Sequence, residues 1–211
     1  MMVRADKDSL VVDRMNSDDY HASVVALGRA FHHDPLLDFL VPDLLSQARA
    51  TLTFLGSVVA DGRPLDEVWV ARAGSVVAGA AVWLPPGTYP RGARREAVSV
   101  IRDLRSVCRL GTRAISGMKI YATIDKAHRE VREPHWYLAL LGCDPLWQGR
   151  GVGTALLEPV LDRADKEGTC AYLETQKVEN IAWYGRRGFK VVKELEVPGC
   201  PTMWAMLREP R

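Results

Sequence analysis

The chain has 211 residues, which suits one α/β domain with a substantial core, because a chain of this length buries roughly 70% of its unfolded surface. The formal net charge of +2 and the 26% of charged residues are ordinary globular values, so they predict neither a nucleic-acid partner nor a membrane partner. No apolar run approaches the ~20 residues of a membrane span, and residues 1–9 lack the apolar core of a signal peptide, so we expect a cytoplasmic protein.

The first part of the chain alternates between helical and strand patterns. We predict a strand, three helices and a β-hairpin in this order, at residues 10–12, 18–30, 36–41, 46–59, and 68–71 with 76–84. Asn16 and Ser17 precede the first helix as candidate caps, and Pro42 ends the second helix. We expect the hairpin to lie beside the central strand of the sheet.

Two groups of side chains have the chemistry of metal ligands. His32, His33 and Asp34 are adjacent, but Pro35 follows them, and neighbouring histidines on a loop seldom point at one centre. We interpret them as a turn at the end of a helix. The cysteines at positions 108, 143, 170 and 200 lie far apart without C-x-x-C spacing, so we predict no metal site and expect free, mostly packed thiols.

Residues 92–129 have a helical pattern. Gly111 and Gly117 interrupt it, which predicts two helices with a joint. Seven arginines between positions 91 and 113 could indicate a nucleic-acid surface. Acidic residues are interspersed and no aromatic platform accompanies them, so we interpret this surface as a solvated one.

The most informative stretch starts with a nearly continuous apolar run at residues 136–143, which predicts a strand buried on both faces. Pro145 ends this strand, and glycines at 149, 151 and 153 then precede a helical pattern. Backbone N–H groups of such a turn, at a helix N-terminus, favour an anion such as phosphate or pyrophosphate. The alternative is a tight turn that binds nothing.

Two familiar phosphate loops fit these residues poorly. The nucleoside-triphosphate loop needs a lysine after its last glycine, whereas Thr154 follows Gly153. The dinucleotide fingerprint would start at Gly149 and needs glycine or alanine at position 154, although Glu174 is near its expected acidic position. A dinucleotide-dependent oxidoreductase therefore stays a weaker alternative.

The rest of the chain predicts a helix, a strand, a short helix and a closing hairpin. After the glycine-rich turn, these elements are predicted at residues 156–164, 170–175, 180–188, and 189–197 with 202–207. Pro159 lies inside the first of these helices, where proline should kink the helix or cost about 3 kcal/mol. The order of all elements predicts an α/β fold, a mixed sheet with helices on both faces.

A third phosphate-loop pattern, Q-x-x-G-x-G, fits residues 148–153 fully. Asn180 stands four residues before Tyr184, and residues 184–189 read Y-G-R-R-G-F. Together these letters resemble the GNAT N-acetyltransferase superfamily. Within it, the chain is most similar to puromycin N-acetyltransferase-type enzymes, through residues 133–138, 172–175 and 196–198.

This resemblance implies the GNAT fold, with residues 1–211 as a single N-acetyltransferase domain. It implies acetyl-CoA as co-substrate, no metal, and a small-molecule amine acceptor such as an aminated antibiotic. It also implies that the strand ending at Cys143 splays from the strand ending at Thr175, so that the pantetheine arm enters the gap between them. A homodimer is compatible with this assignment.

The cofactor-binding residues that the resemblance implies gather at the strand end and in the loop. Backbone groups of Leu141, Gly142 and Cys143 would pair with the pantetheine arm. Asn180 would bind the same arm, with helix capping as the alternative. The pyrophosphate would be held by backbone amides and by the charge of Arg150, within the segment Gln148, Gly149, Arg150, Gly151, Val152, Gly153 and Thr154.

Three residues are candidates for proton transfer. The resemblance assigns Tyr184 as the general acid that protonates the CoA thiolate, and the alternative is a ring packed between helix and sheet. Glu174 ends a buried strand and is a candidate base, or else a salt-bridged or solvent-facing carboxylate. His135 is a second candidate base, or else an exposed strand end. A non-catalytic CoA-binding sensor is the alternative function.

Overall fold

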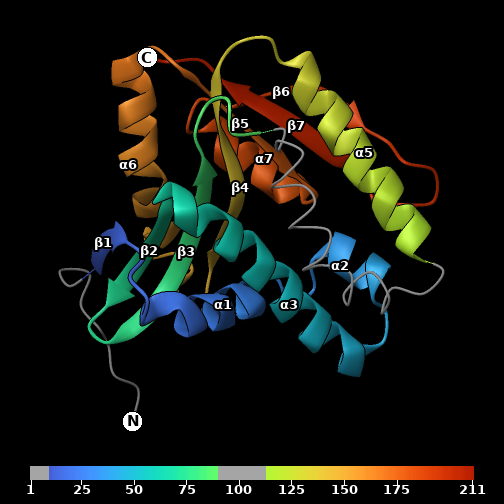
Figure 1. Ribbon diagram of the computed structural model, residues 1–211, viewed down its shortest axis with the longest axis horizontal. Coiled ribbons are helices and arrows are strands. Elements are labelled where there is room, and N and C mark those ends of the chain that lie inside the picture. Colours follow the sequence, from blue (N-terminus) through green and yellow to red (C-terminus); the bar gives the residue numbers. More distant parts are fainter. Residues whose placement is uncertain (1–9, 90–112) are drawn as a thin grey trace.

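The computed structural model describes residues 10–89 and 113–211. Within them, seven strands form one mixed sheet in the order β1-β2-β3-β4-β5-β7-β6 (Figure 1). The strands are β1 (Leu10–Arg14), β2 (Val68–Ala73), β3 (Val76–Leu84), β4 (His135–Cys143), β5 (Cys170–Thr175), β6 (Lys190–Leu195) and β7 (Met203–Arg208). The helices are α1 (Asp19–Ala30), α2 (Pro35–Leu40), α3 (Leu44–Gly62), α5 (Ala114–Glu130), α6 (Val152–Glu167) and α7 (Val178–Gly185), with 3-10 turns η2 (Arg63–Leu65) and η4 (Pro145–Trp147).

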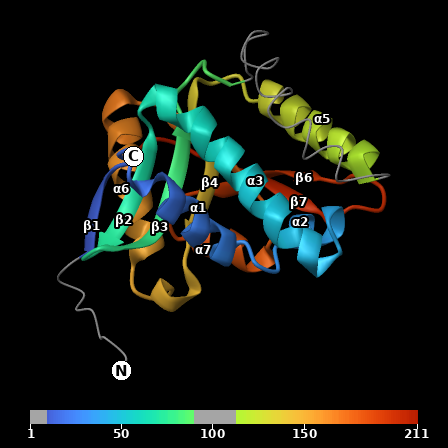
Figure 2. The ribbon, with the colours of Figure 1, turned by 60° about the horizontal axis from the view of Figure 1, so that its bottom comes forward.

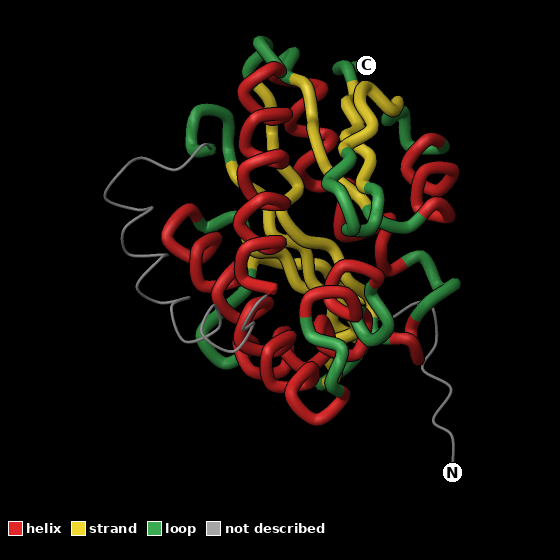
Figure 3. Tube along the Cα trace, turned by 90° about the vertical axis from the view of Figure 1, so that its right-hand side faces the viewer, coloured by secondary structure: helices red, strands yellow, loops and turns green. Residues whose placement is uncertain are grey.

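Helices cover both faces of the sheet, which confirms the predicted mixed α/β architecture (Figure 3). On one face, Leu156 of α6 is fully buried among Trp83 and Leu173 of the strands. On the other face, α1 and α3 lie side by side, and their Leu27 and Leu55 are fully buried (Figure 2). These apolar contacts fix both helix layers on the sheet.

Helix α5 covers the β5–β7 end of the sheet, where Ile120 and Ala127 pack against Tyr172 (Figure 1). Tyr172 and Leu173 are successive residues of β5, so their side chains point to opposite faces. Leu173 belongs to the cluster beneath α6, and Tyr184 of α7 belongs to the same cluster. Helices α6 and α7 therefore share one face, and α5 lies on the other.

The sheet opens at its centre, between β4 and β5. These neighbours are parallel, and their pairing runs only from His135 with Cys170 to Leu138 with Leu173. The register of β4 with β3 shifts at Ala139, which has no Cα partner on β3. Residues 139–143 of β4 therefore have no paired strand on their β5 side. This is the divergence that the resemblance implied.

Most predicted elements are confirmed, including the hairpins β2–β3 and β6–β7. The interruption predicted at Gly117 is wrong, because this glycine lies inside α5, where packing outweighs a helix penalty of about 1 kcal/mol. The helix predicted before it falls largely outside the described residues. Helix α6 runs through Pro159 without ending. None of the described helices has the length and apolar character needed to cross a bilayer.

The prediction that β4 is buried on both faces is confirmed only in part, since Leu138 is buried on one face and Leu140 on the other but other positions are half-buried. Its side chains alternate between buried and half-buried along the whole strand. The half-buried positions include His135 and Tyr137, which line a pocket at the start of the strand. An apolar run cannot reveal such a pocket, because the pocket is formed by residues from other parts of the chain.

Candidate active site

The glycine-rich loop joins the end of β4 to the start of α6. Gly149 and Gly151 have φ angles of 73° and 85°, in the left-handed region where a side chain is strained. Gly153 has an ordinary helical backbone, but a Cβ there would lie 3.1 Å from the ring of Trp183. Two glycines are therefore required by the turn and the third by close packing.

Helix α6 begins with unpaired amides. Its first backbone hydrogen bond runs from the N–H of Ala155 to the carbonyl of Gly151, at 3.0 Å. The N–H groups of residues 152–154 have no partner within the helix, and the helix dipole adds partial positive charge at this end. The positive-φ glycines and these amides fit the pyrophosphate group that the resemblance implied.

Two further side chains of the loop have observed contacts. Gln148 donates from Nε2 to the carbonyl oxygen of Cys143, at 3.3 Å, and so ties the loop to the end of β4. The guanidinium of Arg150 lies 5.0 Å from the ring centroid of Trp147, and Arg150 is exposed. The charge of Arg150 is thus held beside the loop but outside the core.

Strand geometry decides which backbone groups face the gap. The N–H of Asp144 donates to the carbonyl of Ala78 in β3, at 2.9 Å. Because successive residues of a strand direct their backbone groups to opposite sides, those of Leu141 and Cys143 face β5 across the gap. Those of Gly142 face β3, so backbone pairing of Gly142 with a cofactor arm is not supported. Gly142 instead allows α1 to approach closely, since a Cβ there would lie 2.8 Å from a leucine of that helix.

Asn180 and Tyr184 lie one turn apart on α7. The helix begins at Val178 with Lys177 at the N-cap, so the prediction that Asn180 opens or caps the helix is wrong. Asn180 instead donates from Nδ2 to Oγ1 of Thr175, at 3.0 Å. This bond ties α7 to the end of β5, beside the gap.

Tyr184 is buried, with its ring edge-on to the rings of Trp183 and Phe189, whose centroids are 4.9 and 5.7 Å away. Burial raises the pKa of Tyr184 above its usual value, and the nearby Cys143 thiol raises it further, while Arg187 opposes the rise. The phenol therefore keeps its proton at neutral pH. Its proximity to Cys143 places Tyr184 near the end of β4.

Glu174 is the last residue but one of β5. Its Oε1 is buried and accepts no hydrogen bond from any residue in the described ranges. Burial raises the pKa of Glu174 to about 7, although the nearby hydroxyls of Tyr137 and Tyr172 oppose this rise. The carboxyl group is thus poised to take up or release a proton near neutral pH.

Tyr184 and Glu174 approach the gap from opposite faces of the sheet. Tyr184 lies in the apolar cluster beneath α6. Glu174 is two residues after Tyr172 on β5, so it shares the face covered by α5. A phenol therefore lies on one side of the opening and a carboxyl group on the other.

His135 lies where β4 and β5 are still paired, and hence outside the gap. Its Nδ1 is 2.7 Å from the carbonyl oxygen of Glu133, and its Nε2 is 2.7 Å from Nε2 of His128. A carbonyl only accepts, so in neutral His135 the proton is on Nδ1, and Nε2 of His128 must donate to Nε2 of His135. The geometry gives no support to His135 as a base that touches the acceptor.

The sequence analysis missed a cluster of four rings behind Glu174, two of them buried and two half-buried. The rings of His128 and Tyr172 contact each other and those of His135 and Tyr137, with centroids between 4.5 and 6.0 Å apart. A cavity of about 240 Å³ opens beside three of them. The sequence did contain a signal for this cluster, because His135 and Tyr137 on β4, like Tyr172 and Glu174 on β5, are two residues apart and so share a face. The contribution of His128 from α5 could not be predicted from such spacing.

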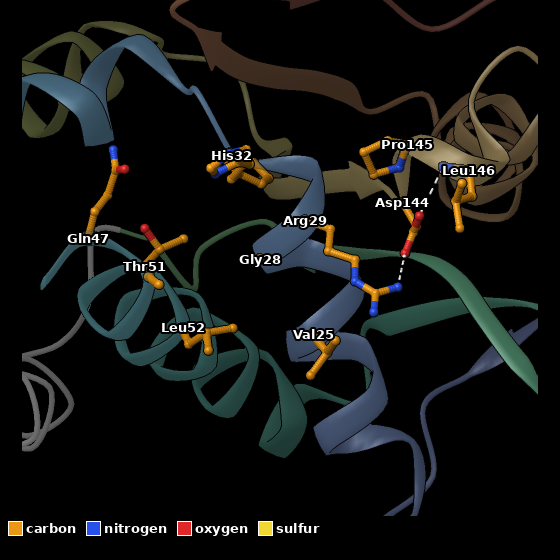
Figure 4. A pocket seen from close by; sticks show the side chains of 12 residues that line it. Val25, Gly28, Arg29, His32, Gln47, Thr51, Leu52, Asp144, Pro145 and Leu146 are labelled. Atoms are coloured by element: carbon orange, nitrogen blue, oxygen red, sulfur yellow. Dashed lines mark hydrogen bonds and ion pairs between the residues drawn. The ribbon is translucent and has the colours of Figure 1, made fainter. Parts of the chain in front are cut away.

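A larger cavity, of about 600 Å³, lies between α1, α3 and the turn after β4 (Figure 4). Arg29 donates to Asp144 across it, at 3.0 Å. Tyr184 and Glu174 do not line this cavity. It is therefore separate from the groups that could transfer a proton.

Asp34 caps α2 by accepting hydrogen bonds from the N–H groups of Leu36 and Leu37, at 3.0 and 3.3 Å. His32 and His33 lie in the turn before it, so their interpretation as a helix-end turn is confirmed. In the described part of the chain, no three side chains of His, Cys, Asp or Glu form a group that could hold a metal ion.

A sequence model of the acetyltransferase (GNAT) family matches residues 59–189, which include the loop, Glu174 and Tyr184. The chain therefore belongs to the GNAT acetyltransferase family. A curated relative, an uncharacterised N-acetyltransferase of Schizosaccharomyces pombe, is 37% identical over 59 residues. That match covers 28% of this chain and 24% of the relative, so the chain spans about a quarter of it.

Solved structures share the fold along nearly the whole chain. A Corynebacterium glutamicum protein described as histone acetyltransferase HPA2 and related acetyltransferase has a TM-score of 0.70 at 23% identity, over 96% of this chain and 97% of that one. Polyamine N-acetyltransferase of Drosophila melanogaster has a TM-score of 0.59 at 19% identity, over 95% of this chain and 99% of that one. Arylalkylamine N-acetyltransferase 2 of Aedes aegypti has a TM-score of 0.63 at 15% identity, over 96% of this chain and 99% of that one.

The buried His128 predicts a loss of stability in acid. Burial, then His135 and Arg129, lower its pKa from 6.5 to about 3, so below pH 6.5 the unfolded chain binds a proton that the folded protein excludes. The free energy of unfolding should fall by roughly 2 kcal/mol from this group between pH 6.5 and 5. Urea unfolding at several pH values in this range gives the free energy of unfolding at each pH. This free energy should fall less steeply with decreasing pH in His128→Phe than in the wild type. His21→Phe, at an exposed histidine of α1, is the control and should keep the wild-type slope; equal slopes in all three proteins would contradict this assignment.

Proposed function

We propose that this protein is an N-acetyltransferase that transfers the acetyl group of acetyl-CoA to the amine of a small molecule. The observation that carries the proposal is the opening between β4 and β5. It leads to the unpaired amides of α6 at one end, with Tyr184 and Glu174 on its two faces.

The gap suits the pantetheine arm because its edge is unpaired backbone. The arm carries amide groups, and Leu141 and Cys143 present backbone groups to it in the manner of a missing strand. The carbonyl of Cys143 already accepts from Gln148, so Leu141 is the freer partner. The loop amides from Gly149 to Thr154 would hold the pyrophosphate, with Asn180 at the edge of the gap.

Bound acetyl-CoA supplies an activated thioester that an amine attacks directly, and the thiolate then leaves. Tyr184 stands near the end of β4, and its phenol keeps its proton at neutral pH. It can give that proton to the departing sulfur, which makes departure easier. Tyr184 is thus the proposed general acid.

Glu174 is the proposed general base. An amine must lose a proton to attack, and a carboxylate with a pKa of about 7 accepts a proton better than an ordinary glutamate does. It lies on the α5 face, so the amine would enter from the side opposite Tyr184. This arrangement separates the proton that leaves the amine from the proton that reaches the sulfur.

The proposed class of acceptor amine is based on the residues near Glu174, on the face of the sheet covered by α5. Residues 133–138 and 172–175, which carry part of the similarity to puromycin N-acetyltransferase-type enzymes, contribute three of the four rings near Glu174, namely His135, Tyr137 and Tyr172. Two of the three fold relatives named above are described as a polyamine and an arylalkylamine N-acetyltransferase. We therefore propose an amine with an apolar or aromatic frame, of which puromycin is one example.

Tyr184→Phe tests the acid. The variant should lower kcat about 100-fold or more, because the sulfur then leaves without a proton, while affinity for acetyl-CoA changes little. Steady-state kinetics with thiol detection would measure both quantities. Tyr121→Phe, on the exposed side of α5, is the matched control and should keep wild-type rates. An unchanged kcat in Tyr184→Phe would remove this tyrosine from the mechanism.

Glu174→Gln tests the base through the pH profile of kcat/KM. In the wild type the base works only when deprotonated, so kcat/KM should rise through a midpoint near pH 7. The variant should lose this midpoint, keep only the ionisation of the amine itself, and be slower by about 100-fold or more. Glu179→Gln, at an exposed position of α7, should keep the wild-type profile. A midpoint near 7 that persists in Glu174→Gln would rule out this assignment.

The proposed function itself is tested by calorimetric titration with acetyl-CoA, followed by thiol release with a panel of amines. The panel should contain a polyamine, an arylalkylamine, puromycin and a lysine peptide. We expect saturable binding and release with one of the small-molecule classes. Binding without release by any amine would favour a sensor, and absence of binding would contradict the proposal.

A further inference from the structure

Arg187 follows α7 and reaches across to the first turn of α6. Its Nη2 donates to Oγ1 of Thr154, the third residue of α6. Its Nη1 donates to the carbonyl oxygen of Trp183, at 2.7 Å. The guanidinium also stacks on the Trp183 ring, 3.4 Å from the centroid, and that ring is the one that contacts Gly153. Arg187 is thus fixed beside two residues of the loop.

The charge of Arg187 has no direct ion pair in the described residues, although Glu158 of α6 interacts with it at longer range. No salt bridge joins it to an acidic side chain in residues 10–89 or 113–211, and its buried Nε forms no hydrogen bond there. Burial lowers the pKa of Arg187, and the neighbouring Arg186 lowers it further, while Tyr184 and Glu158 oppose this change. A half-buried cation without a direct ion pair is stabilised when an anion binds beside it.

The bond to Thr154 also orients a hydroxyl group. A threonine hydroxyl has one donor and two acceptor positions. Arg187 occupies an acceptor position, so the O–H of Thr154 remains free to donate. The amide of Thr154 is one of the unpaired amides at the start of α6. Both donors of this residue are therefore available at the place where the loop would hold a diphosphate.

We propose that Arg187 is a positioning residue for the diphosphate of acetyl-CoA, which holds the Thr154 hydroxyl in a donating orientation and adds positive charge at the start of α6. This inference rests on the proposed function. It assigns to Arg187 a role that the loop pattern alone does not include, because Arg187 lies 33 residues beyond Thr154 in the chain.

The experiment compares ligands that keep or lack the diphosphate. Dissociation constants are measured by calorimetry for acetyl-CoA, and by competition against it for S-acetylpantetheine, which has the arm but lacks the diphosphate together with the 3′-phosphoadenosine. Acetyl-dephospho-CoA, which keeps the diphosphate and lacks only the 3′-phosphate, should be affected as much as acetyl-CoA. Arg187→Gln should weaken the binding of acetyl-CoA about 10- to 100-fold, the range for loss of a charge-assisted hydrogen bond. The affinity for S-acetylpantetheine should not change. Arg187→Lys keeps the charge and should recover part of the affinity for acetyl-CoA.

Arg186→Gln is the matched control, because it removes the same charge from the exposed neighbour. It should change affinity for acetyl-CoA by less than about threefold, as expected for a screened surface charge. If Arg186→Gln weakened acetyl-CoA binding as much as Arg187→Gln, the effect would be one of general charge and the inference would be overturned. If Arg187→Gln weakened the binding of acetyl-CoA and S-acetylpantetheine equally, the effect would be structural damage, which would also overturn it. Wild-type affinity in Arg187→Gln would also overturn it. Failure of the wild type to bind acetyl-CoA would instead overturn the proposed function.

Discussion

The structure depends on one interruption of backbone pairing. β4 and β5 are hydrogen-bonded neighbours up to Leu138 and Leu173, and beyond this point each keeps its other neighbour. Buried backbone groups need partners, so the freed edge of β4 is a place where a ligand can complete the sheet. The bulge at Ala139 lies at the start of this edge, and the glycine loop lies at its end. The separation of two strands thus connects the sheet to the N-terminal end of α6, whose first amides are unpaired within the helix.

Burial acts on the two candidate catalytic groups in complementary ways. It keeps the phenol of Tyr184 protonated and brings the pKa of Glu174 to about 7. One group can thus donate a proton and the other can accept one at the same pH. They lie on opposite faces of the sheet because Tyr172 and Leu173, which pack against different helices, are successive residues of β5. Pleat alternation therefore places the two candidate groups on opposite faces of the sheet.

The family match extends over both the glycine loop and the α5 side of the molecule. It covers residues 59–189, which include the loop, α7 and α5, and the Corynebacterium glutamicum structure shares the fold over 96% of the chain. The α5 side is built from His128, His135, Tyr137 and Tyr172, whose rings surround the approach to Glu174. At 15–23% identity, the fold relatives share the architecture without defining this side.

The sequence by itself determined the order of elements, the hairpins, the glycine turn and the family, because these depend on local periodicity and on spacing within about 40 residues. It placed Tyr184, Asn180 and Glu174 correctly on their elements, yet it could not show that Asn180 bonds Thr175 or that Gly142 serves α1 packing. Tertiary structure decided these, and also the pairing of His128 with His135 and of Arg187 with Thr154. Some of these contacts join residues far apart in the chain, such as Arg187 and Thr154, and others join successive elements, such as Asn180 and Thr175. All of them depend on how the helices pack on the assembled sheet.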